Sequence, residues 1–343
     1  MLEFIIITIV KLLVIFMVVM TIAAYSTLAE RKVSAYMQNR IGPNRVGPFG
    51  LLQPLADVIK MVFKEEIIPD HVNPFFYVAG PAIMVFIALL PWTAIPFGEN
   101  LELFGYIIPI QISDLNLGIL FMIAIASLGV FGIMLGGWAS NNKFSLLGAV
   151  RASAQMISYE LTMGLSLAAV FLLAGSVDLR NIIGSQQSSV WQWNIIVQPV
   201  GFIIFFVSML AETNRNPFDL AEAESELVVG YHTEYGGFKM SLYILSEYIN
   251  MVTASALITV LYFGGWSIPF VDFHALGFNQ NLIAIISVAV FTAKTLFFIF
   301  VFLWVRWTLP RFRYDQLMNL GWKALLPLSI ANLMITALVA LLV

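Results

Sequence analysis

One short segment of the sequence, residues 212–226, concentrates carboxylates in a chain that is otherwise poor in charge. It holds five of the chain's 20 acidic residues, although 60% of the chain is hydrophobic. The five are Glu212, Asp219, Glu222, Glu224 and Glu226. Crowded carboxylates repel one another, and partial burial adds to this effect, so both raise their pKa values toward neutrality. Groups of this kind titrate as a coupled cluster and can accept and release protons. The segment therefore predicts proton transfer, and a solvated acidic loop is the alternative.

Further charges lie inside long apolar stretches, at Glu160, Glu247, Lys294 and Lys11. A charge at the centre of a bilayer costs about 2.5–3.5 kcal/mol on insertion scales, so such residues usually face a polar interior and take part in ion movement. We expect Glu160 and Glu247 to continue the proton path. Lys294 is either part of this path or a structural counter-charge. Lys11 lies near the start of its stretch, where a lysine can reach the interface.

The residues that bind redox metals are scarce. The chain has no cysteine and three histidines, His71, His232 and His274, all in polar connections. A four-cysteine cluster or structural zinc site cannot be built from this set, and intramembrane haem needs axial ligands within the spans. We therefore predict that the chain binds no metal and no redox cofactor of its own. The net charge of −3 gives no reason to expect a nucleic-acid partner.

The elements that must position these residues are membrane helices. Only 11% of the residues are charged, against roughly 25% in soluble domains. A hydrocarbon core takes roughly 20 helical residues, and backbone polar groups in lipid must be satisfied internally. We predict an all-α polytopic membrane protein, residues 1–343 forming a single membrane domain. The expected spans are eight: about 4–29, 75–96, 115–138, 147–174, 195–211, 240–264, 282–305 and 324–343.

Lysine and arginine give the orientation. Fourteen of them lie in or beside the odd-numbered connections: Arg31, Lys32, Arg40, Arg45, Lys60, Lys64, Lys143, Arg151, Arg215, Lys239, Arg306, Arg311, Arg313 and Lys323. The even-numbered connections hold Arg180 alone. Because basic loops stay on the cytoplasmic side, the odd connections are expected there, including 30–74 and 212–239.

The first of these connections contains a short amphipathic helix. Apolar residues recur at helical spacing over about 52–64, with Asp57 and Lys60 on the opposite side. Thirteen or so residues cannot cross a bilayer. We expect this helix to lie flat in the membrane interface, and packing on a partner protein is the alternative.

Three segments resemble one family. The stretches "ERKVSAYMQNRIGPNRVGPFGLLQPLADVIKMVFKEEIIP" at 30–69, "ETNRNPFDLAEAESELVVGYHTEYGGFKMSLYILSEY" at 212–248 and "PRFRYDQLMNLGWKALLPL" at 310–328 are similar to the H subunit of NADH-quinone oxidoreductase, the bacterial counterpart of mitochondrial NADH dehydrogenase subunit 1. The resemblance implies a subunit of respiratory complex I that is not active alone and forms the membrane end of the quinone chamber. Electrons would arrive from an iron–sulfur cluster in a neighbouring subunit, with quinone as the substrate.

The resemblance also implies roles for single residues. The expected quinone-binding residues are Arg31, Arg40, Asp57, Arg215 and Phe218. The expected proton path comprises Glu160, Glu212, Glu222, Glu224, Glu226, Glu247 and Lys294, and no residue is assigned a catalytic step. The implied partners are the peripheral quinone-site and cluster-bearing subunits, the small membrane subunits, the antiporter-like subunits and lipid. The bacterial inner membrane is the expected location, with the mitochondrial inner membrane as the alternative.

Two other functions stay open at this point. A homologous membrane subunit of an ion-translocating hydrogenase would use the same architecture with another electron acceptor. A stand-alone secondary transporter would also place glutamate and lysine within its spans. The elaborate polar connections on one side favour a docking face, and hence a subunit of a complex, over a transporter.

Overall fold

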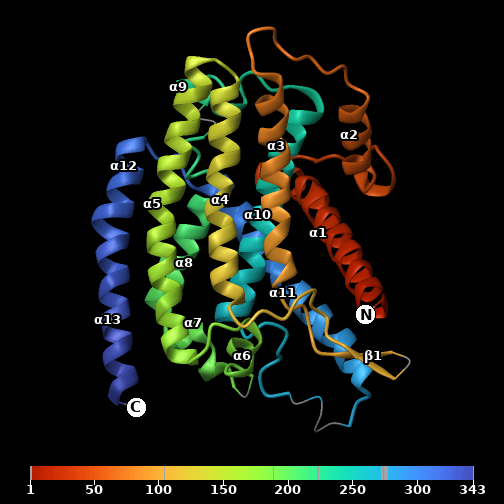
Figure 1. The fold of residues 1–343 in the computed structure, drawn as a ribbon, viewed down its shortest axis with the longest axis vertical. Coiled ribbons are helices and arrows are strands. Elements are labelled where there is room, and N and C mark those ends of the chain that lie inside the picture. Colours follow the sequence, from red (N-terminus) through yellow and green to blue (C-terminus); the bar gives the residue numbers. More distant parts are fainter. Residues whose placement is uncertain are drawn as a thin grey trace.

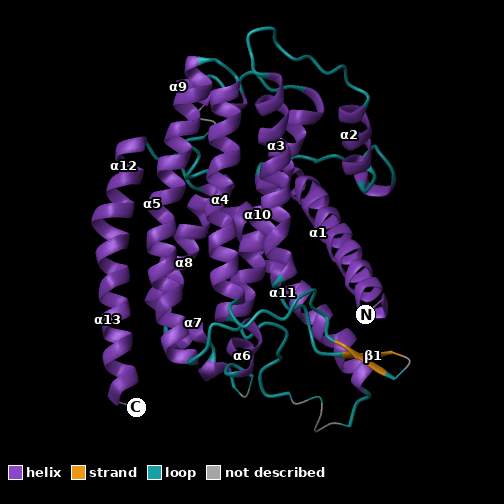
Figure 2. Cartoon of the chain, viewed as in Figure 1, coloured by secondary structure: helices purple, strands orange, loops and turns teal. Residues whose placement is uncertain are grey.

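The computed structural model describes residues 2–103, 105–187, 189–221, 224–271, 273 and 277–342, with the backbone alone at 2–4, 103, 224 and 225. In this part of the chain the fold is almost wholly helical (Figures 1 and 2). The long helices are α1 (Leu2–Met37), α3 (Pro74–Leu89), α4 (Gly118–Ala139), α5 (Lys143–Ala174), α8 (Pro199–Glu212), α10 (Gly237–Tyr262), α11 (Gln280–Thr308) and α13 (Leu326–Leu342). The expected all-α membrane fold is confirmed.

Shorter elements connect them. These are α2 (Gln53–Val62), α6 (Leu179–Gly184), α7 (Asn194–Val197), α9 (Glu224–Leu227) and α12 (Tyr314–Asn319), with 3-10 turns at Pro48–Gly50, Leu90–Thr93, Val190–Gln192 and Gly230–His232. Strands β1 (Leu101–Leu103) and β2 (Tyr106–Ile108) form one small antiparallel hairpin in which Leu101 pairs with Ile108. The sequence pattern did not predict this hairpin. It lies at the opposite end of the bundle from α2 and α9 (Figure 2).

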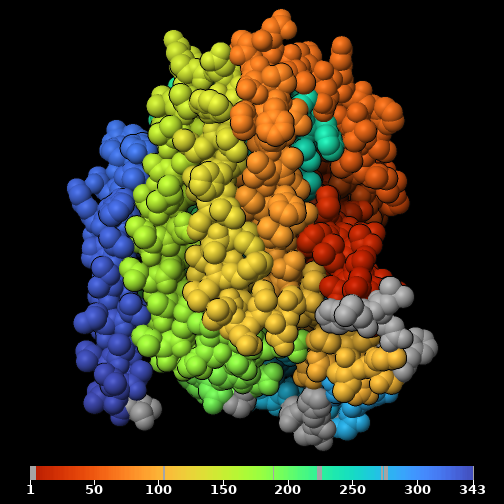
Figure 3. Space-filling model, viewed as in Figure 1, coloured from red at the N-terminus to blue at the C-terminus, as the bar shows by residue number. Residues whose placement is uncertain are grey.

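Helix α10 forms the centre of the bundle. It packs on α3, α11 and α1, while α4 packs on α3 and α5, and α5 packs on α8 and α13. Most of α10 is buried, whereas only a small part of α1 and of the C-terminal helix is buried. Figure 3 shows the C-terminal helix at one edge of the molecule. In a bilayer the exposed apolar helices can face lipid, and the inner helix can carry polar side chains.

Within the described residues, seven helices are long and apolar enough to cross a membrane. The expected span at 195–211 corresponds instead to α7 and α8, which are interrupted at Gln198. The break has a local cause, because Pro199 lacks an N–H and disfavours helical geometry in the residue before it. The Gln198 side chain donates to Oγ1 of Thr336 on α13, at 2.7 Å. Helix α8 is therefore a short inner helix of 14 residues.

The C-terminal helix contains one turn of π-helix at Leu320–Leu325, directly before α13. Pro327 follows in the first turn of α13. Its ring cannot supply an N–H to the preceding turn, and a local widening of the helix accommodates this. At the same level, the Tyr159 hydroxyl on α5 donates to the carbonyl oxygen of Leu317, at 2.9 Å.

The acidic segment is held against the end of α5. Gly148 on α5 and Gly230 approach closely, since a Cβ at position 148 would lie 2.8 Å from Cα of Gly230. Only a glycine fits at position 148 without displacing the loop. This contact fixes the connection between α8 and α10 on the bundle end where most of the basic connections lie.

Candidate functional site

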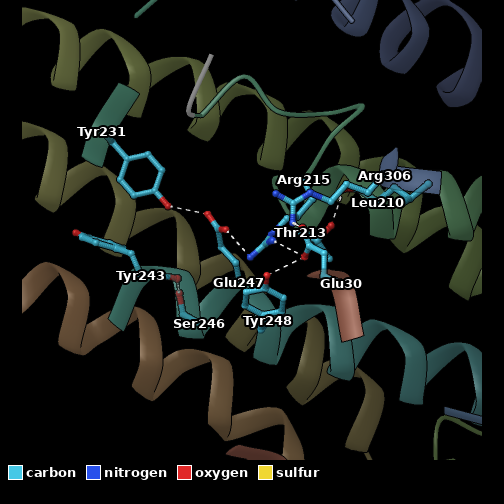
Figure 4. A network of polar contacts seen from close by, with 10 residues as sticks. All are labelled: Glu30, Leu210, Thr213, Arg215, Tyr231, Tyr243, Ser246, Glu247, Tyr248 and Arg306. Carbon is cyan, nitrogen blue, oxygen red and sulfur yellow. Dashed lines mark hydrogen bonds and ion pairs between the residues drawn. The ribbon is translucent and has the colours of Figure 1, made fainter. Parts of the chain in front are cut away.

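A group of buried charges joins four elements at this end of the bundle (Figure 4). Arg215, in the connection after α8, lies between Glu30 of α1 and Glu247 of α10. Its Nη1 is 3.4 Å from Oε2 of Glu30, and its Nη2 is 3.1 Å from Oε2 of Glu247. Nη1 of Arg306, on α11, lies 2.5 Å from the other oxygen of Glu30. Two cations and two carboxylates thus balance, with Arg215, Glu30 and Glu247 buried and Arg306 partly exposed.

Two tyrosines complete this network. The Tyr248 hydroxyl donates to Oε2 of Glu30 at 2.8 Å, and its ring lies 4.0 Å from the Arg215 guanidinium carbon. The Tyr231 hydroxyl donates to Oε1 of Glu247 at 3.2 Å. Each carboxylate therefore has a cation and a phenol as partners, which is what a buried charge requires. We refer to Glu30, Arg215, Glu247, Tyr248, Tyr231 and Arg306 as the Arg215 network.

The turn after α8 directs Arg215 back into the bundle. Asn214 has a left-handed backbone, with φ of 51°, which reverses the chain directly before Arg215. Gln155 on α5 holds this turn, because its amide nitrogen donates to the carbonyl oxygens of Ala211 and Phe218, both at 2.8 Å, and lies 3.2 Å from Oδ1 of Asn214. A buried side chain of a membrane helix thus fixes the loop that carries the central cation.

The electrostatics of the connection favour a fixed charge at Arg215. Burial alone would lower the pKa of Arg215, but Glu247, Tyr248 and Glu30 outweigh it and raise the pKa above its usual value. The opposite holds for His232, for which burial and then the nearby Arg215 lower the pKa to about 3. Arg215 is therefore a permanent cation, and His232 is a neutral imidazole at pH 7.

The predicted quinone-binding residues lie in three places. Nη1 of Arg31, at the end of α1, pairs with Oδ2 of Asp57 on α2 at 2.7 Å, and this pair is partly exposed. Arg40 lies in a surface groove of about 420 Å³ together with Lys32 and Tyr36. Arg215 lies below the surface, in the network. The structure brings Arg31 and Asp57 together, but it does not place the three sites around one opening in the described part of the chain, and quinone binding by these residues stays a prediction.

Phe218 lies in the core rather than at a surface. Its side chain is 2% exposed and packs edge-on against Tyr159 and also against Phe312, with ring centroids 5.4 Å apart in both cases. In this structure Phe218 joins the loop to α5 and to the segment before α12. Its predicted contact with quinone remains a prediction.

Two of the predicted proton-path carboxylates lie on the inner helices. Glu212 lines a cavity of about 60 Å³ at the bundle centre, and Asn250 and Thr253 on α10 line the same cavity. Glu160, on α5, accepts a hydrogen bond from the Ser127 hydroxyl on α4. A cavity of this volume has room for water. The remainder of its wall is apolar and rich in methionine.

Two further acids of the segment form ion pairs with arginines. Oε2 of Glu226 lies 2.7 Å from Nη2 of Arg151, and the Glu226 side chain is 49% exposed. Oδ2 of Asp219 pairs with Arg311 at 2.5 Å. Glu222 lies outside the described residues, and for Glu224 the structure describes the backbone alone. Their place in the proton path stays a prediction.

Lys294 has a well-defined environment on the opposite side of the bundle. Its ammonium donates to the carbonyl oxygens of Phe263, Gly265 and Ser267, at 2.7, 3.0 and 2.7 Å. The chain leaves α10 through these residues, so Lys294 satisfies carbonyls that the end of a helix leaves free. This geometry gives Lys294 a structural role, and its part in proton transfer remains a prediction.

Sequence reasoning missed Glu30, Arg306 and the two tyrosines of the network. Glu30 and Arg306 stand at the ends of apolar stretches, where charges usually face water. One signal was present, since Tyr248 directly follows the singled-out Glu247. Among the described residues, no group of three histidine, aspartate or glutamate side chains could hold a metal ion.

Comparison with known proteins decides the family. A family model described as NADH dehydrogenase matches residues 10–337. The chain belongs to this family. Members similar to it include an NADH-quinone oxidoreductase H subunit of Cytophaga hutchinsonii, 54% identical over 322 residues, 94% of this chain and 93% of the relative.

Two further members of the NADH dehydrogenase family are similar over most of their length. The NADH-quinone oxidoreductase H subunit of Flavobacterium johnsoniae is 52% identical over 332 residues, covering 97% of this chain and 94% of the relative. The protein of the same name from Leptospira biflexa is 53% identical over 329 residues, covering 93% of this chain and 90% of the relative. The suspected resemblance is thereby confirmed.

Proposed function

We propose that this chain is the membrane subunit of a proton-pumping NADH:quinone oxidoreductase, in which it forms the membrane end of the quinone chamber and couples quinone reduction to proton movement. The observation that carries the proposal is the Arg215 network. It ties a loop at one end of the bundle to titratable groups on the helices of the membrane domain. The names of the relatives give the reaction, and the network gives this chain a means to respond to it.

The first connection suits a substrate that arrives from lipid. Leu55, Ile59 and Val62 on α2 are about half exposed and form an apolar face. A helix with such a face lies in the membrane interface. Beside it, Arg31 and Arg40 offer N–H groups that can donate to the carbonyl oxygens of a quinone. In this proposal these residues and Asp57 shape the chamber opening, and Arg215 lies further in.

The electrons come from another subunit. The chain has no cysteine, so a thiolate-bound iron–sulfur cluster must belong to a neighbour. The partly exposed pairs Arg151–Glu226 and Arg311–Asp219 hold the connection between α8 and α10 against α5 and against the segment before α12, where a peripheral subunit can reach them. We propose that these connections dock the cluster-bearing and quinone-site subunits.

Quinone reduction then changes the charge around the network. Conversion of quinone to quinol takes up two electrons and two protons. We propose that Glu247 passes on protons bound for the quinone, taking each one up from the aqueous side and releasing it toward the chamber. While Glu247 holds a proton, its attraction to Arg215 falls, and Arg215 is left paired with Glu30. Because Arg215 is part of the turn held by Gln155, this change acts on the loop and on α5, which carries Glu160. Glu212 and Glu160 provide the next proton-accepting groups toward the membrane interior.

Replacement of the inner carboxylates tests this function. In the intact complex, Glu212→Gln and Glu160→Gln should lower NADH-driven quinone reduction and proton pumping, but electron transfer from NADH to ferricyanide should persist because it precedes quinone. Glu102→Gln, on the exposed hairpin, is the matched control. Normal quinone turnover and normal pumping in both inner variants would reject the proposal.

The relatives and the helices also support a location. Seven helices can span a membrane in the described part of the chain, and the relatives named above come from bacteria. We propose the bacterial inner membrane, with the antiporter-like and small membrane subunits of the complex beside the exposed helices.

A further inference from the structure

Two basic side chains lie toward the end of the bundle that is opposite the basic connections. Arg180, in α6, is the one lysine or arginine of the even-numbered connections, and Lys11 lies in the first half of α1. The N-terminal end of α1, the β1–β2 hairpin and α6 all lie toward this end of the molecule (Figure 1). Neither side chain has a part in the quinone chamber or in the acidic path described above. We refer to Lys11 and Arg180 as the outer cation pair.

One glutamine joins the two cations. The Lys11 ammonium donates to the main-chain carbonyl oxygen of Gln111 at 3.2 Å, and Nε of Arg180 donates to the side-chain Oε1 of the same residue at 2.8 Å. Gln111 is buried, and its amide nitrogen donates to the carbonyl oxygen of Ala94 at 2.8 Å. Nη1 of Arg180 donates to Oδ1 of Asn100 at 3.2 Å. Because both cations bond to one fixed residue, α1 and α6 bring their positive charges to the same place.

The side-chain nitrogens of the pair have neutral acceptors. The ion pairs of the described residues all involve other cations, so no carboxylate of this part of the chain pairs with Lys11 or Arg180. Asp178 accepts from the backbone N–H of Arg180 at 3.0 Å, whereas Nη2 of the guanidinium is buried and has no acceptor among the described residues. Charges withdrawn from water are normally paired. The described chain therefore brings two positive charges together without supplying an anion for them.

The surface beside Lys11 is apolar and exposed. Val14 and Val18 follow Lys11 by three and seven positions, so they lie on the same face of α1. Both are about half exposed, and Met17 beside them is more exposed. We refer to Val14, Met17 and Val18 as the apolar strip. It runs from the cations toward the middle of α1, and a phospholipid has the matching arrangement of a negative headgroup followed by acyl chains.

We propose that the outer cation pair binds the phosphate of an anionic glycerophospholipid, such as phosphatidylglycerol, in the leaflet opposite the basic connections. The Lys11 ammonium has three donors and uses one on Gln111, so two remain for the phosphate oxygens. Arg180, which is closed off at Nη2, acts through its charge and by holding Gln111. The acyl chains lie along the apolar strip.

The charge of the pair sets the class of lipid. A zwitterionic phospholipid carries an ammonium of its own, which the second cation of the pair would repel, so a headgroup with a net negative charge is favoured. The binding is non-covalent and requires only that the chain lies in a bilayer. It therefore does not depend on the proposed quinone chemistry, and either proposal can fail without the other.

The test measures photolabelling of the intact complex. The complex is placed in phosphatidylcholine vesicles with a photoreactive phosphatidylglycerol that carries a diazirine in one acyl chain, at a fraction too low to saturate the site. After illumination, mass spectrometry measures the lipid attached to peptides of α1. Lys11→Gln and Arg180→Gln should each lower this labelling about fivefold, which corresponds to the roughly 1 kcal/mol that one basic residue near a membrane surface contributes.

Two further variants serve as controls. Lys11→Arg keeps the positive charge and should be labelled as strongly as the wild type. Lys143→Gln removes an exposed lysine at the start of α5, at the other end of the bundle, and is the matched control for loss of one charge. Its labelling at α1 should also equal that of the wild type.

Competition on the wild-type complex identifies the source of the phosphate. Unlabelled phosphatidylglycerol should displace the photoreactive lipid from α1, whereas the same amount of added phosphatidylcholine, or inorganic phosphate, should not. Displacement by inorganic phosphate would show a site for a free anion and would overturn the lipid proposal. Labelling that phosphatidylglycerol does not displace would overturn it too.

The remaining outcomes are equally decisive. Unchanged labelling in both glutamine variants, or an equal loss in Lys143→Gln, would show that the outer cation pair does not hold the lipid. Absence of labelling at α1, with a carbodiimide joining Lys11 to a carboxylate of another subunit, would show that a protein partner supplies the anion. If a glutamine variant does not assemble, the competition on the wild-type complex decides by the criteria given for it.

Discussion

Removal of the Arg215 guanidinium should uncouple the loop from the membrane helices. The substitution Arg215→Met keeps a long apolar side chain but leaves Glu247 without the cation that lies 3.1 Å away. Glu30 keeps Arg306. The side chains of Arg215, Glu30 and Glu247 are each at most 9% exposed, so solvent cannot replace the lost partner. Breaking a buried pair from one side costs about 3–5 kcal/mol, because an uncompensated charge remains.

The assay is a double-mutant cycle on the membrane-bound complex. Membranes that carry Arg215→Met, Glu247→Gln or both substitutions are heated. Thermal stability is then followed as the NADH:quinone activity that remains, divided by the NADH:ferricyanide activity of the same sample. The double variant removes both charges, so its loss of stability should be smaller than the sum of the two single losses, by an interaction free energy of about 0.5–3 kcal/mol. Arg313→Met, which breaks an exposed pair with Asp315, should show no measurable change. If Arg215→Met matched the wild type, or the two single effects added up, the buried pair would not have the role assigned to it.

Three further predictions test other parts of the structure. Lys294→Met should leave three carbonyls unsatisfied and lower the free energy of unfolding by about 1–3 kcal/mol for each carbonyl that stays buried. The variant complex should then lose activity at a lower temperature than the wild type, with normal turnover before heating. Lost proton pumping at normal thermal stability would instead place Lys294 in the proton path. His232 binds a proton below its ordinary pKa of 6.5 in the unfolded chain but below about 3 in the folded chain, so its contribution to stability is complete above pH 6.5 and is lost as the pH falls toward 3. The wild-type complex should therefore be inactivated at a lower temperature at pH 5 than at pH 7, and His232→Gln should make this difference in inactivation temperature smaller. The same difference in the variant and the wild type would contradict the burial of a neutral imidazole. Tyr248→Phe, which removes the hydroxyl that donates to Glu30, should slow quinone reduction more than ferricyanide reduction. If quinone reduction in the variant kept the wild-type rate, this hydrogen bond would not matter for turnover.

The sequence predicted the fold well because the signals are local. Apolar stretches long enough to cross a bilayer mark the helices, and the break at Gln198 follows from the proline after it. The short helix expected at about 52–64 is present as α2, Gln53–Val62. The β1–β2 hairpin was not foreseen, because two three-residue strands leave no periodicity to read.

The candidate site was only partly predictable, because its contacts join distant parts of the chain. Glu30 and Arg215 are 185 positions apart, and no local pattern pairs them. Regular spacing of acids in the 212–226 segment suggested one cluster, yet Glu226 pairs with Arg151 on α5 and Glu212 lines an inner cavity. Tertiary packing separates residues that the sequence places side by side. Lys294 shows the same limit, since its carbonyl partners become visible only in the folded connection.

Coupling through the Arg215 network can be measured as the number of protons translocated per NADH oxidised, in sealed vesicles that carry the Glu247→Gln complex. Glutamine keeps the shape and the hydrogen bond from Tyr231, but it can neither hold a negative charge against Arg215 nor take up a proton. We expect electron transfer to ferricyanide to continue while this ratio falls well below that of the wild type. An unchanged ratio at normal quinone turnover would show that protons pass without the Arg215 network.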